Sequence, residues 1–304
     1  MRVSDLGMQA ILLQSFQNAQ NAAQTRQIQL GSGDRFQTYG GYGADALRLV
    51  SAEGVISRAS AFENASSIAL SRLETQGASL EQISDSVESI RAGFIRTLSN
   101  GNAELLPPEI ETAAQRIIAA LNINIGGVYL FGGTAGDRPP VTAGSLGDIG
   151  AAPSIPALFD EGGRASLTVE EGGTIDGGPL ASEVAADLFV ELQSFANIEA
   201  TLGPLDGELT AAQRDFLVAA SARLGEIADD LYQIQGLSAV SQGQAADAAD
   251  RNRRAREAAE ITAAEIEDVD IAEALSALSQ DQIAIEASAR ALAEATQLSL
   301  LNFI

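Results

Sequence analysis

The chain has 304 residues, a formal net charge of −23, and no Cys, His or Trp. The lack of Cys and His excludes disulfides, thiol nucleophiles, His-based triads and the usual transition-metal ligands. With 41 acidic and 18 basic residues, the surface repels phosphate backbones, so nucleic-acid binding is not expected.

The first predicted element is an amphipathic helix over residues 4–30. Its apolar residues recur at intervals of three, four or seven, and Arg26 interrupts the stripe. The stripe consists of Leu12, Phe16, Ala19, Ala23 and Leu30. Five glycines within the next thirteen residues predict a loop over 31–43.

Residues 44–98 are predicted to form one long helix with a seven-residue repeat. One seam runs through Ala52, Ala59, Ser66, Leu73, Leu80, Val87 and Phe94. Its companion, three residues on, runs through Val55, Phe62, Ala69, Gln76, Ile83, Ile90 and Thr97. Seven successive repeats indicate a coiled-coil-like partner helix, and the large apolar residues of both seams are the expected core.

The middle of the chain is predicted to hold another helix and a small β-rich insertion. Pro107 and Pro108 open this helix at its first turn, and a short apolar strand follows at 128–131. Gly and Pro are dense over 137–180, where alternation at 165–170 predicts a strand flanked by turns. A sheet this small is marginal alone, so we expect it to pack on the helices.

After residue 180 the chain is expected to return through helices, the last running from 210 to 301. Its seam runs through Leu217, Leu224, Ile227, Leu231 and Ile234, and later through Ile271, Leu278, Ile285 and Leu292. Between 238 and 264 the seam fades into Ser and Ala. That length fits a close-packed seam of small residues and an exposed, poorly packed helix equally well.

These elements predict a mainly α fold: an elongated coiled-coil-like bundle of long helices from both chain ends, with a small β-rich insertion in the middle. Residues 1–43, the N-terminal assembly helix and loop, are expected to share a domain with the C-terminal assembly helix at 265–304. Residues 44–136 and 181–264 are expected to form the core domain, and 137–180 the surface insertion.

No group of residues forms a convergent catalytic or ligand-binding constellation. Carboxylate pairs such as Glu170 and Glu171 lack a convergent partner, so solvated faces explain them better. Asp268 and Asp270 recur as in a calcium loop, but the central Gly and the twelfth-position Glu are missing. We therefore expect no catalytic, cofactor-binding or metal site, no cofactor and no enzymatic activity.

The apolar pattern continues to the last residue, although chain ends are usually frayed and polar. Amphipathic ends with one apolar stripe cannot bury it alone. Residues 1–40 and 265–304 are therefore expected to be largely unfolded in the monomer and to become helical against neighbouring copies. The candidate interface residues are Leu6, Leu12, Phe16, Ile271, Leu275, Leu278, Ile285, Leu292, Leu298, Leu301 and Phe303.

Four segments together resemble the bacterial flagellin superfamily. They are MRVS at 1–4, LGSGDR at 30–35, VYLFGGT at 128–134 and LSLLNFI at 298–304. No single segment is specific, but their order and their distances from the two ends are. The third segment, followed by Asp137 and two prolines, is most similar to the hook–filament junction branch of that superfamily.

The resemblance implies a structural subunit of the bacterial flagellum that joins hook to filament, its terminal helices packing in an inner tube by helical self-assembly. Filament flagellin is the alternative, because only Asp45 is acidic where the family usually has an acidic pair. A cytoplasmic coiled-coil adaptor is the less favoured interpretation.

The implied partners are copies of the chain in a ring or tube, a neighbouring hook-associated protein, flagellin and an export chaperone. The implied location is extracellular, reached by the flagellar type III route. The N-terminal segment lacks the apolar core and cleavage site of a secretory signal. No stretch approaches the ~18 apolar residues of a membrane span.

Overall fold

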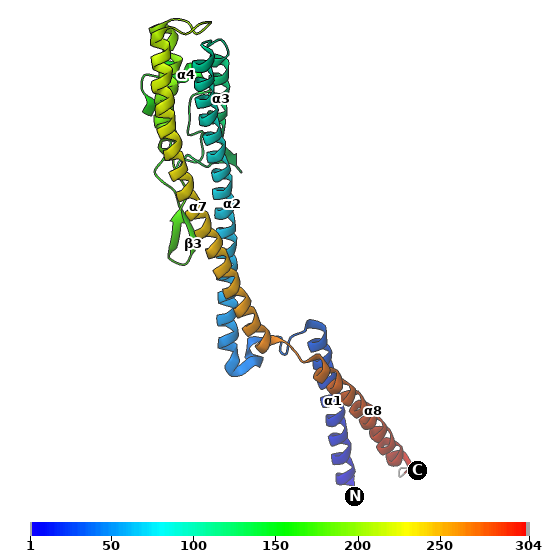
Figure 1. Ribbon diagram of the computed structural model, residues 1–304. Coiled ribbons are helices and arrows are strands. Elements are labelled where there is room, and N and C mark those ends of the chain that lie inside the picture. The colour runs from blue at the N-terminus through cyan, green and yellow to red at the C-terminus, as the bar shows by residue number, and fades with distance from the viewer. Residues whose placement is uncertain (1, 302–304) are drawn as a thin grey trace. The chain divides into compact units, whose positions relative to one another are not determined.

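The computed structural model describes residues 2–301, with the side chains of residues 7, 8 and 10–294. The elements are, in chain order, α1 (Arg2–Ser32), η1 (Tyr39–Asp45), α2 (Ala46–Asn100), α3 (Leu106–Leu121), β1 (Asn124–Ile125), β2 (Val128–Tyr129), α4 (Leu146–Ala151), η2 (Ile155–Leu158), β3 (Ser166–Glu170), β4 (Gly173–Asp176), α5 (Ala181–Ala196), α6 (Ile198–Leu202), α7 (Ala211–Glu267) and α8 (Ile271–Leu301). The predicted mainly α fold, with long helices from both ends and small strand pairs between them, is confirmed (Figure 1).

Two compact units divide the chain, and unit 1 combines both of its ends. Unit 1 comprises Met1–Arg58 and Ala255–Ile304, and unit 2 comprises Ala59–Arg254. Unit 1 therefore contains α1 and α8 together with the first turns of α2 and the last turns of α7. Unit 2 contains the remainder of those two long helices and everything between them.

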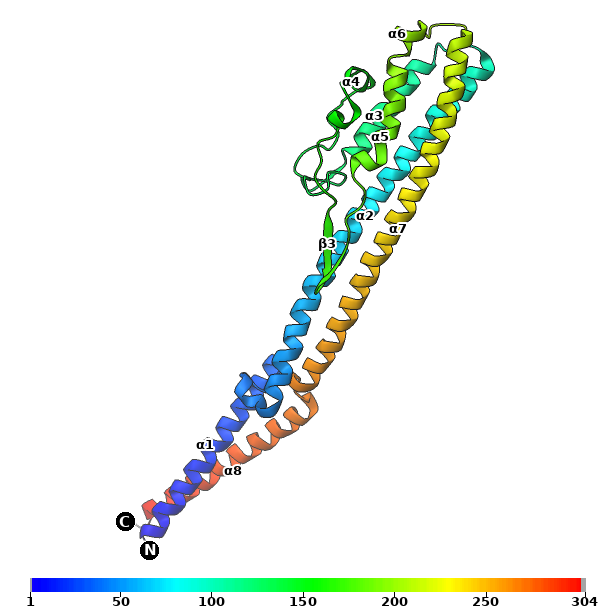
Figure 2. The ribbon, with the colours of Figure 1, turned by 90° about the vertical axis from the view of Figure 1, so that its left-hand side faces the viewer.

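Unit 2 is organised around α2 and α7, which run side by side with α3 and α5 against them (Figure 2). One apolar cluster joins these helices to the insertion, and Leu80, Ile83, Ile117 and Phe131 are completely buried in it. The structure buries these predicted seam residues: Leu73, Leu80, Ile83, Val87, Ile90, Phe94, Leu217, Leu224, Ile227 and Leu231. It leaves Phe62 and Ile234 half-buried.

The small-residue length of α7 is close-packed between 238 and 248. Ser238 and Ser241 are buried, and Ala245 and Ala248 are 0% exposed. The two alanines share an apolar cluster with Ala69 and Leu73 of α2 and with Val169 and Ile175 of the β3–β4 hairpin. Small side chains thus allow α2, α7 and the hairpin to pack together. Of the two interpretations, the close-packed seam holds for this length.

The two hairpins differ in part from the expected strands. The strand predicted at 165–170 is β3, and it pairs with β4, which was not predicted, through Leu167 and Ile175. The strand predicted at 128–131 is shorter, because β2 contains only Val128 and Tyr129. Leu130 and Phe131 leave the strand and are buried in the core, which explains why all four positions are apolar.

The helical stretch expected from 210 to 301 is divided into two helices, because residues 268–270 separate α7 from α8. The N–H of Val269 donates to the carbonyl of Gly33 at 2.8 Å and so leaves the helical pattern. Oδ1 of Asp270 accepts hydrogen bonds from the N–H groups of Ala272 at 2.9 Å and Glu273 at 3.1 Å. Asp270 is therefore the N-cap of α8.

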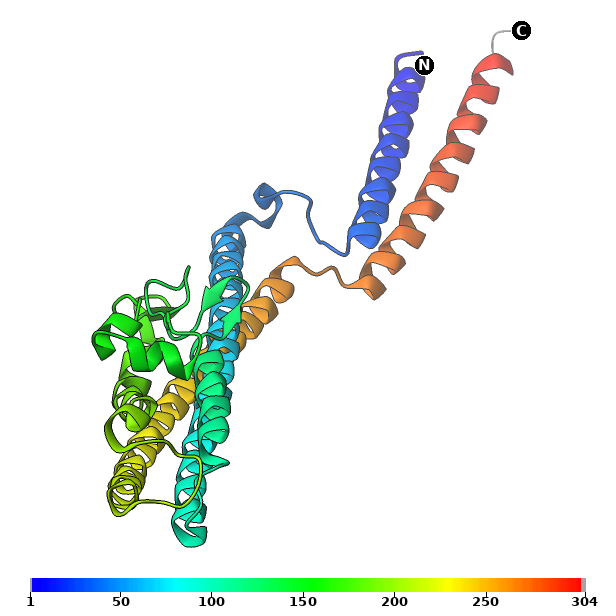
Figure 3. The same ribbon diagram turned by 90° about the horizontal axis from the view of Figure 1, so that it is seen from above.

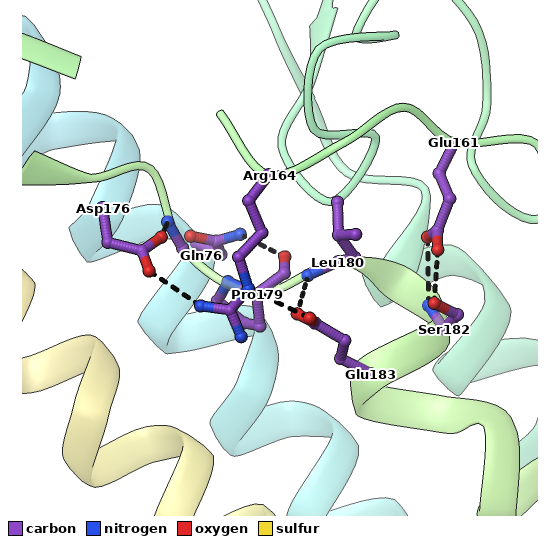
Figure 4. Close-up of polar contacts among 9 residues, drawn as sticks. Gln76, Glu161, Arg164, Asp176, Pro179, Leu180, Ser182 and Glu183 are labelled. Atoms are coloured by element: carbon purple, nitrogen blue, oxygen red, sulfur yellow. Dashed lines mark hydrogen bonds and ion pairs between the residues drawn. The ribbon is translucent and has the colours of Figure 1, made fainter. Parts of the chain in front are cut away.

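One buried side chain of α2 holds both ends of the insertion. Nε2 of Gln76 donates to the carbonyl oxygen of Leu130 at 3.1 Å and to that of Pro179 at 3.2 Å, the second of which Figure 4 shows. Gln76 is 1% exposed and lies in a seam whose only other polar residue is Thr97. Gly178 has a φ of 98°, and a Cβ there would overlap the Gln76 amide. Only glycine therefore allows the backbone to pass this close to Gln76.

An ion-pair cluster reinforces the same attachment. The guanidinium of Arg164 contacts Asp176 at 2.7 Å and Glu183 at 3.0 Å (Figure 4). The second oxygen of Glu183 accepts from the N–H of Leu180 at 2.9 Å, which caps α5. Hydrogen bonding to Glu183, the larger contribution, and to Asp176 raises the pKa of Arg164. The insertion is thus tied to the start of α5 as well as to α2.

Candidate assembly interface

Within unit 1, α1 and α8 pack against each other in opposite directions. Figure 3 shows the first turns of α1 at the same end of the pair as the last turns of α8. In the described part of the pair, the buried apolar side chains are Ala19, Ala23 and Ala274. Two helices alone cannot enclose large side chains, so the only apolar residues that their shared face buries are alanines.

Large apolar side chains remain exposed on both helices. Met8 is 60% exposed and Ile11 65% exposed on α1, and Ile271 is 62% exposed and Ile283 65% exposed on α8. Leu13, Ile28 and Leu275 are also exposed. Such density of exposed apolar residues on two neighbouring helices is typical of a surface that another protein covers.

The predicted interface residues fall into three groups. Leu12, Phe16, Leu278, Ile285 and Leu292 are half-buried, whereas Ile271 and Leu275 are exposed. The side chains of Leu6, Leu298 and Leu301, and Phe303 as a whole, lie outside the described residues. Five further exposed residues were not predicted, because they lie off the single apolar stripe of each helix: Met8, Ile11, Leu13, Ile28 and Ile283. The sequence contained a signal for these residues, because apolar side chains occur on several sides of α1, as in helices that are covered on several sides.

The segments that follow α1 and precede α8, together called the turn of unit 1, are joined by an antiparallel β-bridge between Asp34 and Asp268, which fixes the register of the two helices. The N–H of Arg35 donates to the carbonyl of Glu267 at 2.7 Å, next to the bond between Val269 and Gly33. Gly33 has a φ of 87°, a conformation that favours glycine. Beside the turn, a small apolar cluster contains Leu49, Ala52, Ala263 and Ile266. The end of α1 is therefore held to the start of α8 through this turn.

Several carboxylates gather at this turn. Burial raises the pKa of Glu267, and the neighbouring charges of Asp34, Glu53 and Asp268 raise it further. The hydroxyl of Tyr39 donates to Oε2 of Glu53 at 2.8 Å, and this hydrogen bond raises the pKa of Tyr39. The charged form of Glu267 therefore destabilises the folded turn, and neutralising this carboxylate stabilises the turn.

A shallow apolar groove adds to the exposed surface of unit 1. It has a volume of about 540 Å³ and lies between the first turns of α2 and the last turns of α7. Its lining includes Leu47, which is 76% exposed, together with Val55, Ala255 and Ala258. The groove widens the area of unit 1 that is suited to contact with another chain.

The part of the chain that the structure describes holds neither a metal site nor a membrane-spanning helix. No group of three or more Asp or Glu residues in this part of the chain could hold a metal ion. Asp270 is instead occupied as a helix cap. No helix in the same range is long and apolar enough to cross a membrane.

Two family models match the chain on either side of the insertion. The bacterial flagellin N-terminal helical region matches residues 3–135, and the bacterial flagellin C-terminal helical region matches residues 225–304. No curated protein matches the sequence significantly.

Among solved structures, a provisionally assigned flagellar hook-associated protein from Vibrio parahaemolyticus has a similar fold, with a TM-score of 0.58 and 12% sequence identity. The similarity covers 73% of this chain and 97% of the Vibrio chain. At this identity the likeness concerns the fold alone. The two matched regions, however, include α1, α2, α3 and α8 and much of α7. The chain therefore belongs to the bacterial flagellin family, and it is a structural, non-enzymatic protein that self-assembles in the bacterial flagellum.

Proposed function

We propose that the chain is the subunit that joins the flagellar hook to the filament, the role of hook-associated protein 3, and that unit 1 is its assembly domain. The observation that carries this assignment of unit 1 is the distribution of exposed apolar residues. Of the 22 large apolar side chains that are exposed in the described structure, twelve lie in unit 1, the smaller of the two units. The apolar cluster of unit 1 contains only four buried residues.

One observation supports the junction role in particular, and a second supports a hook-associated role in general. The segment over 128–134 leads into the insertion, and its Phe131 is buried. Gly133 has a φ of 60° and packs directly against the backbone of Gly163. This is the segment that resembles the junction branch. The Vibrio structure is also covered over 97% of its own length, so the shared fold accounts for nearly all of a protein assigned to the hook-associated class.

Filament flagellin remains the alternative, and electron microscopy of cells lacking the chain separates the two roles. A junction subunit predicts complete hooks without filaments, with flagellin released into the medium. A flagellin predicts hooks that still carry their junction proteins but have short filaments or none. Normal, attached filaments would contradict both roles.

Complementation of those cells tests unit 1 with a matched pair of variants. Ile283→Glu in α8 and Ile68→Glu in α2 change isoleucines that are 65% and 63% exposed, so neither change disturbs a core. Ile283→Glu is expected to abolish complementation, because it places a charge on the proposed assembly face. Ile68→Glu in unit 2 is expected to restore filaments. Equal complementation by the two variants would show that assembly does not depend on unit 1.

Export belongs to the same proposal. We expect the chain to leave the cell by the flagellar type III route without a cleaved signal, and a chaperone to cover the apolar faces of α1 and α8 before export. Those faces expose Ile11 and Ile283, which a free subunit would otherwise present to the cytoplasm. Mass spectrometry of the chain from isolated flagella should find its first residues intact. A start well inside α1 would contradict this route.

A further inference from the structure

The middle of α7, within unit 2, has no charged side chain over sixteen residues, from Leu231 to Ala246. Asp230 precedes this length and Asp247 follows it, and every charged residue of α7 lies outside it. In a protein with a formal net charge of −23, so long a neutral length on a surface helix is unusual. Burial explains the lack of charge on the inner side, where Ser238 and Ala245 pack, but not on the outer side.

The outer side of this length exposes apolar residues. Tyr232 is 55% exposed, Leu237 69% exposed and Val240 57% exposed. Helical spacing places Tyr232, Gly236, Val240 and Gly243 on one side, away from the buried seam. We call the surface formed by Tyr232, Gly236, Leu237, Val240 and Gly243 the α7 face.

The two glycines of the α7 face have no role in the fold of the single chain. A Cβ at Gly236 or Gly243 would meet no atom within 4 Å, whereas one at Gly77 would lie 2.6 Å from Nε2 of Gln242. Gly77 is therefore explained by the approach of α7, but Gly236 and Gly243 are not. Glycine inside a helix is less stable than alanine, so these two positions fit close approach by a surface outside the chain.

Charged groups surround the α7 face. On the α2 side, Glu81 and Asp85 line a groove of about 430 Å³ together with Tyr232. On the opposite side, Leu237 lines a small cavity together with Arg164, whose guanidinium is paired with Asp176 and Glu183. An apolar centre with a charged rim is the usual anatomy of a protein–protein interface.

We propose that the α7 face packs against a second copy of this chain in the assembled flagellum. Charge favours a copy at this place, because two strongly acidic subunits approach most closely where neither presents a charge. The proposal rests on the self-assembly of the family and not on the junction role. It therefore holds equally for a junction subunit and for a flagellin.

The size of the face also selects a copy over an unrelated partner. Sixteen residues of helix span about 24 Å, which is too little to supply the roughly 1,200 Å² of total buried surface that a stable complex needs. A free partner would have to bind through this face alone. A copy that is already held through unit 1 is present at high effective concentration, so a small additional contact is sufficient for it.

Cysteine labelling tests the contact, because the chain has no cysteine of its own. Val240→Cys places a thiol on the α7 face, and Val218→Cys is the control, since Val218 is 55% exposed on the same helix but has Arg214 and Asp215 nearby. Both thiols should react with a polyethylene glycol maleimide in the purified subunit. In intact flagella, labelling should be lost at position 240 and retained at position 218. Equal labelling of the two positions in flagella would overturn the proposal.

Photocrosslinking identifies the occupant. A benzophenone maleimide is attached to the thiol of the Val240→Cys variant, and flagella that contain it are irradiated. Covalent dimers of this chain, identified by mass spectrometry, are the expected product. Crosslinks to another flagellar protein alone, or the absence of crosslinks, would overturn the proposal.

A substitution at Gly236 adds a readout that does not depend on a label. Gly236→Leu fills open space and replaces a poor helix former, so the purified subunit should unfold at the same or a slightly higher temperature while its incorporation into flagella is lost. Undiminished incorporation of a folded Gly236→Leu subunit would also count against the proposal. Failure of these tests leaves the junction assignment open, because hooks without filaments report on that role separately.

Discussion

Units 1 and 2 are each built around a pair of long helices, α1 with α8 in unit 1 and α2 with α7 in unit 2, but they differ in how much apolar surface they enclose. In unit 2, α2 and α7 are joined by α3, α5 and the insertion, so that Leu80, Ile83 and Phe189 are 0% exposed. In unit 1, α1 and α8 have only each other, and their described buried apolar residues are alanines. Long amphipathic helices alone are therefore not sufficient for a closed core.

The difference concerns what each unit needs in order to be stable. Helices in water are marginal unless tertiary packing buries their apolar face. Unit 2 supplies that packing itself, whereas unit 1 has most of its large apolar side chains half-buried or exposed. We infer that unit 2 folds as a stable subunit body and that the helices of unit 1 are completed by neighbouring copies.

The largest effect is expected in unit 2 when the matched substitutions Ile83→Ala and Ile283→Ala are compared. Ile83 is 0% exposed in unit 2, so its loss leaves a cavity and should lower the free energy of unfolding by about 2–5 kcal/mol. Ile283 is 65% exposed in unit 1, so its loss should change the free energy by less than about 0.5 kcal/mol in the free subunit. Chemical denaturation of the two variants measures both values. Similar losses would remove the distinction between the units.

The next effect is expected at the attachment of the insertion in unit 2. Gln76→Leu keeps the volume but leaves the carbonyls of Leu130 and Pro179 without their donor, at an expected cost of about 1–3 kcal/mol. Amide exchange over 131–180 should accelerate. Gln82→Leu, at an exposed position of the same helix, is the control and should leave this exchange unchanged. An unaltered insertion in Gln76→Leu would show that Gln76 does not hold it.

A smaller effect is expected at the cap of α8 in unit 1. Asp270→Ala removes the acceptor for the N–H groups of Ala272 and Glu273 and should weaken the first turn of α8 by about 1 kcal/mol. Asp270→Asn retains a capping oxygen and should behave like the original chain. Amide exchange at residues 272 and 273 measures this difference. Identical exchange in the two variants would mean that the cap adds nothing.

The smallest effect is expected from pH at the turn of unit 1. The folded pKa of Glu267 lies above its ordinary value of 4.5, so the charged form is disfavoured by folding. The stability that protonated Glu267 contributes to the turn is therefore fully present below pH 4.5 and is lost as the pH rises through the raised pKa. Glu267→Gln should remove this loss and slow the exchange of the Val269 amide at neutral pH, after correction for its intrinsic rate. Equal exchange in both proteins at neutral pH would refute the account.

Much of the fold could be predicted because one physical signal persists over long distances. The seven-residue repeat from Ala52 to Phe94 indicates both a long helix and a partner for it. The break at 268–270 was missed, although Asp270 and Glu273 have the spacing of a capping box. The apolar period continues across the break into α8, so it favoured a continuous helix over the break that the capping box indicates.

The remaining elements depend on contacts that a local pattern does not contain. The short helix α4 and the turn η2 occur in Gly- and Pro-rich sequence, where bonds such as Thr142 N–H to the carbonyl of Leu158 at 2.9 Å fix the path. The exposed part of the candidate site could not be predicted from the apolar stripes either. A single stripe defines which side of a helix faces inward, and Ile11 and Ile283 lie off the stripes that were followed.

Hydrogen exchange of the free subunit and of assembled flagella tests the central claim most directly. In the free subunit, the amides of α1 and α8 should exchange rapidly, while those around Leu80 and Ile83 in unit 2 remain protected. After assembly, α1 and α8 should become as protected as the body of unit 2. Protection of α1 and α8 in the free subunit that matches unit 2 would show that unit 1 is complete without neighbouring copies.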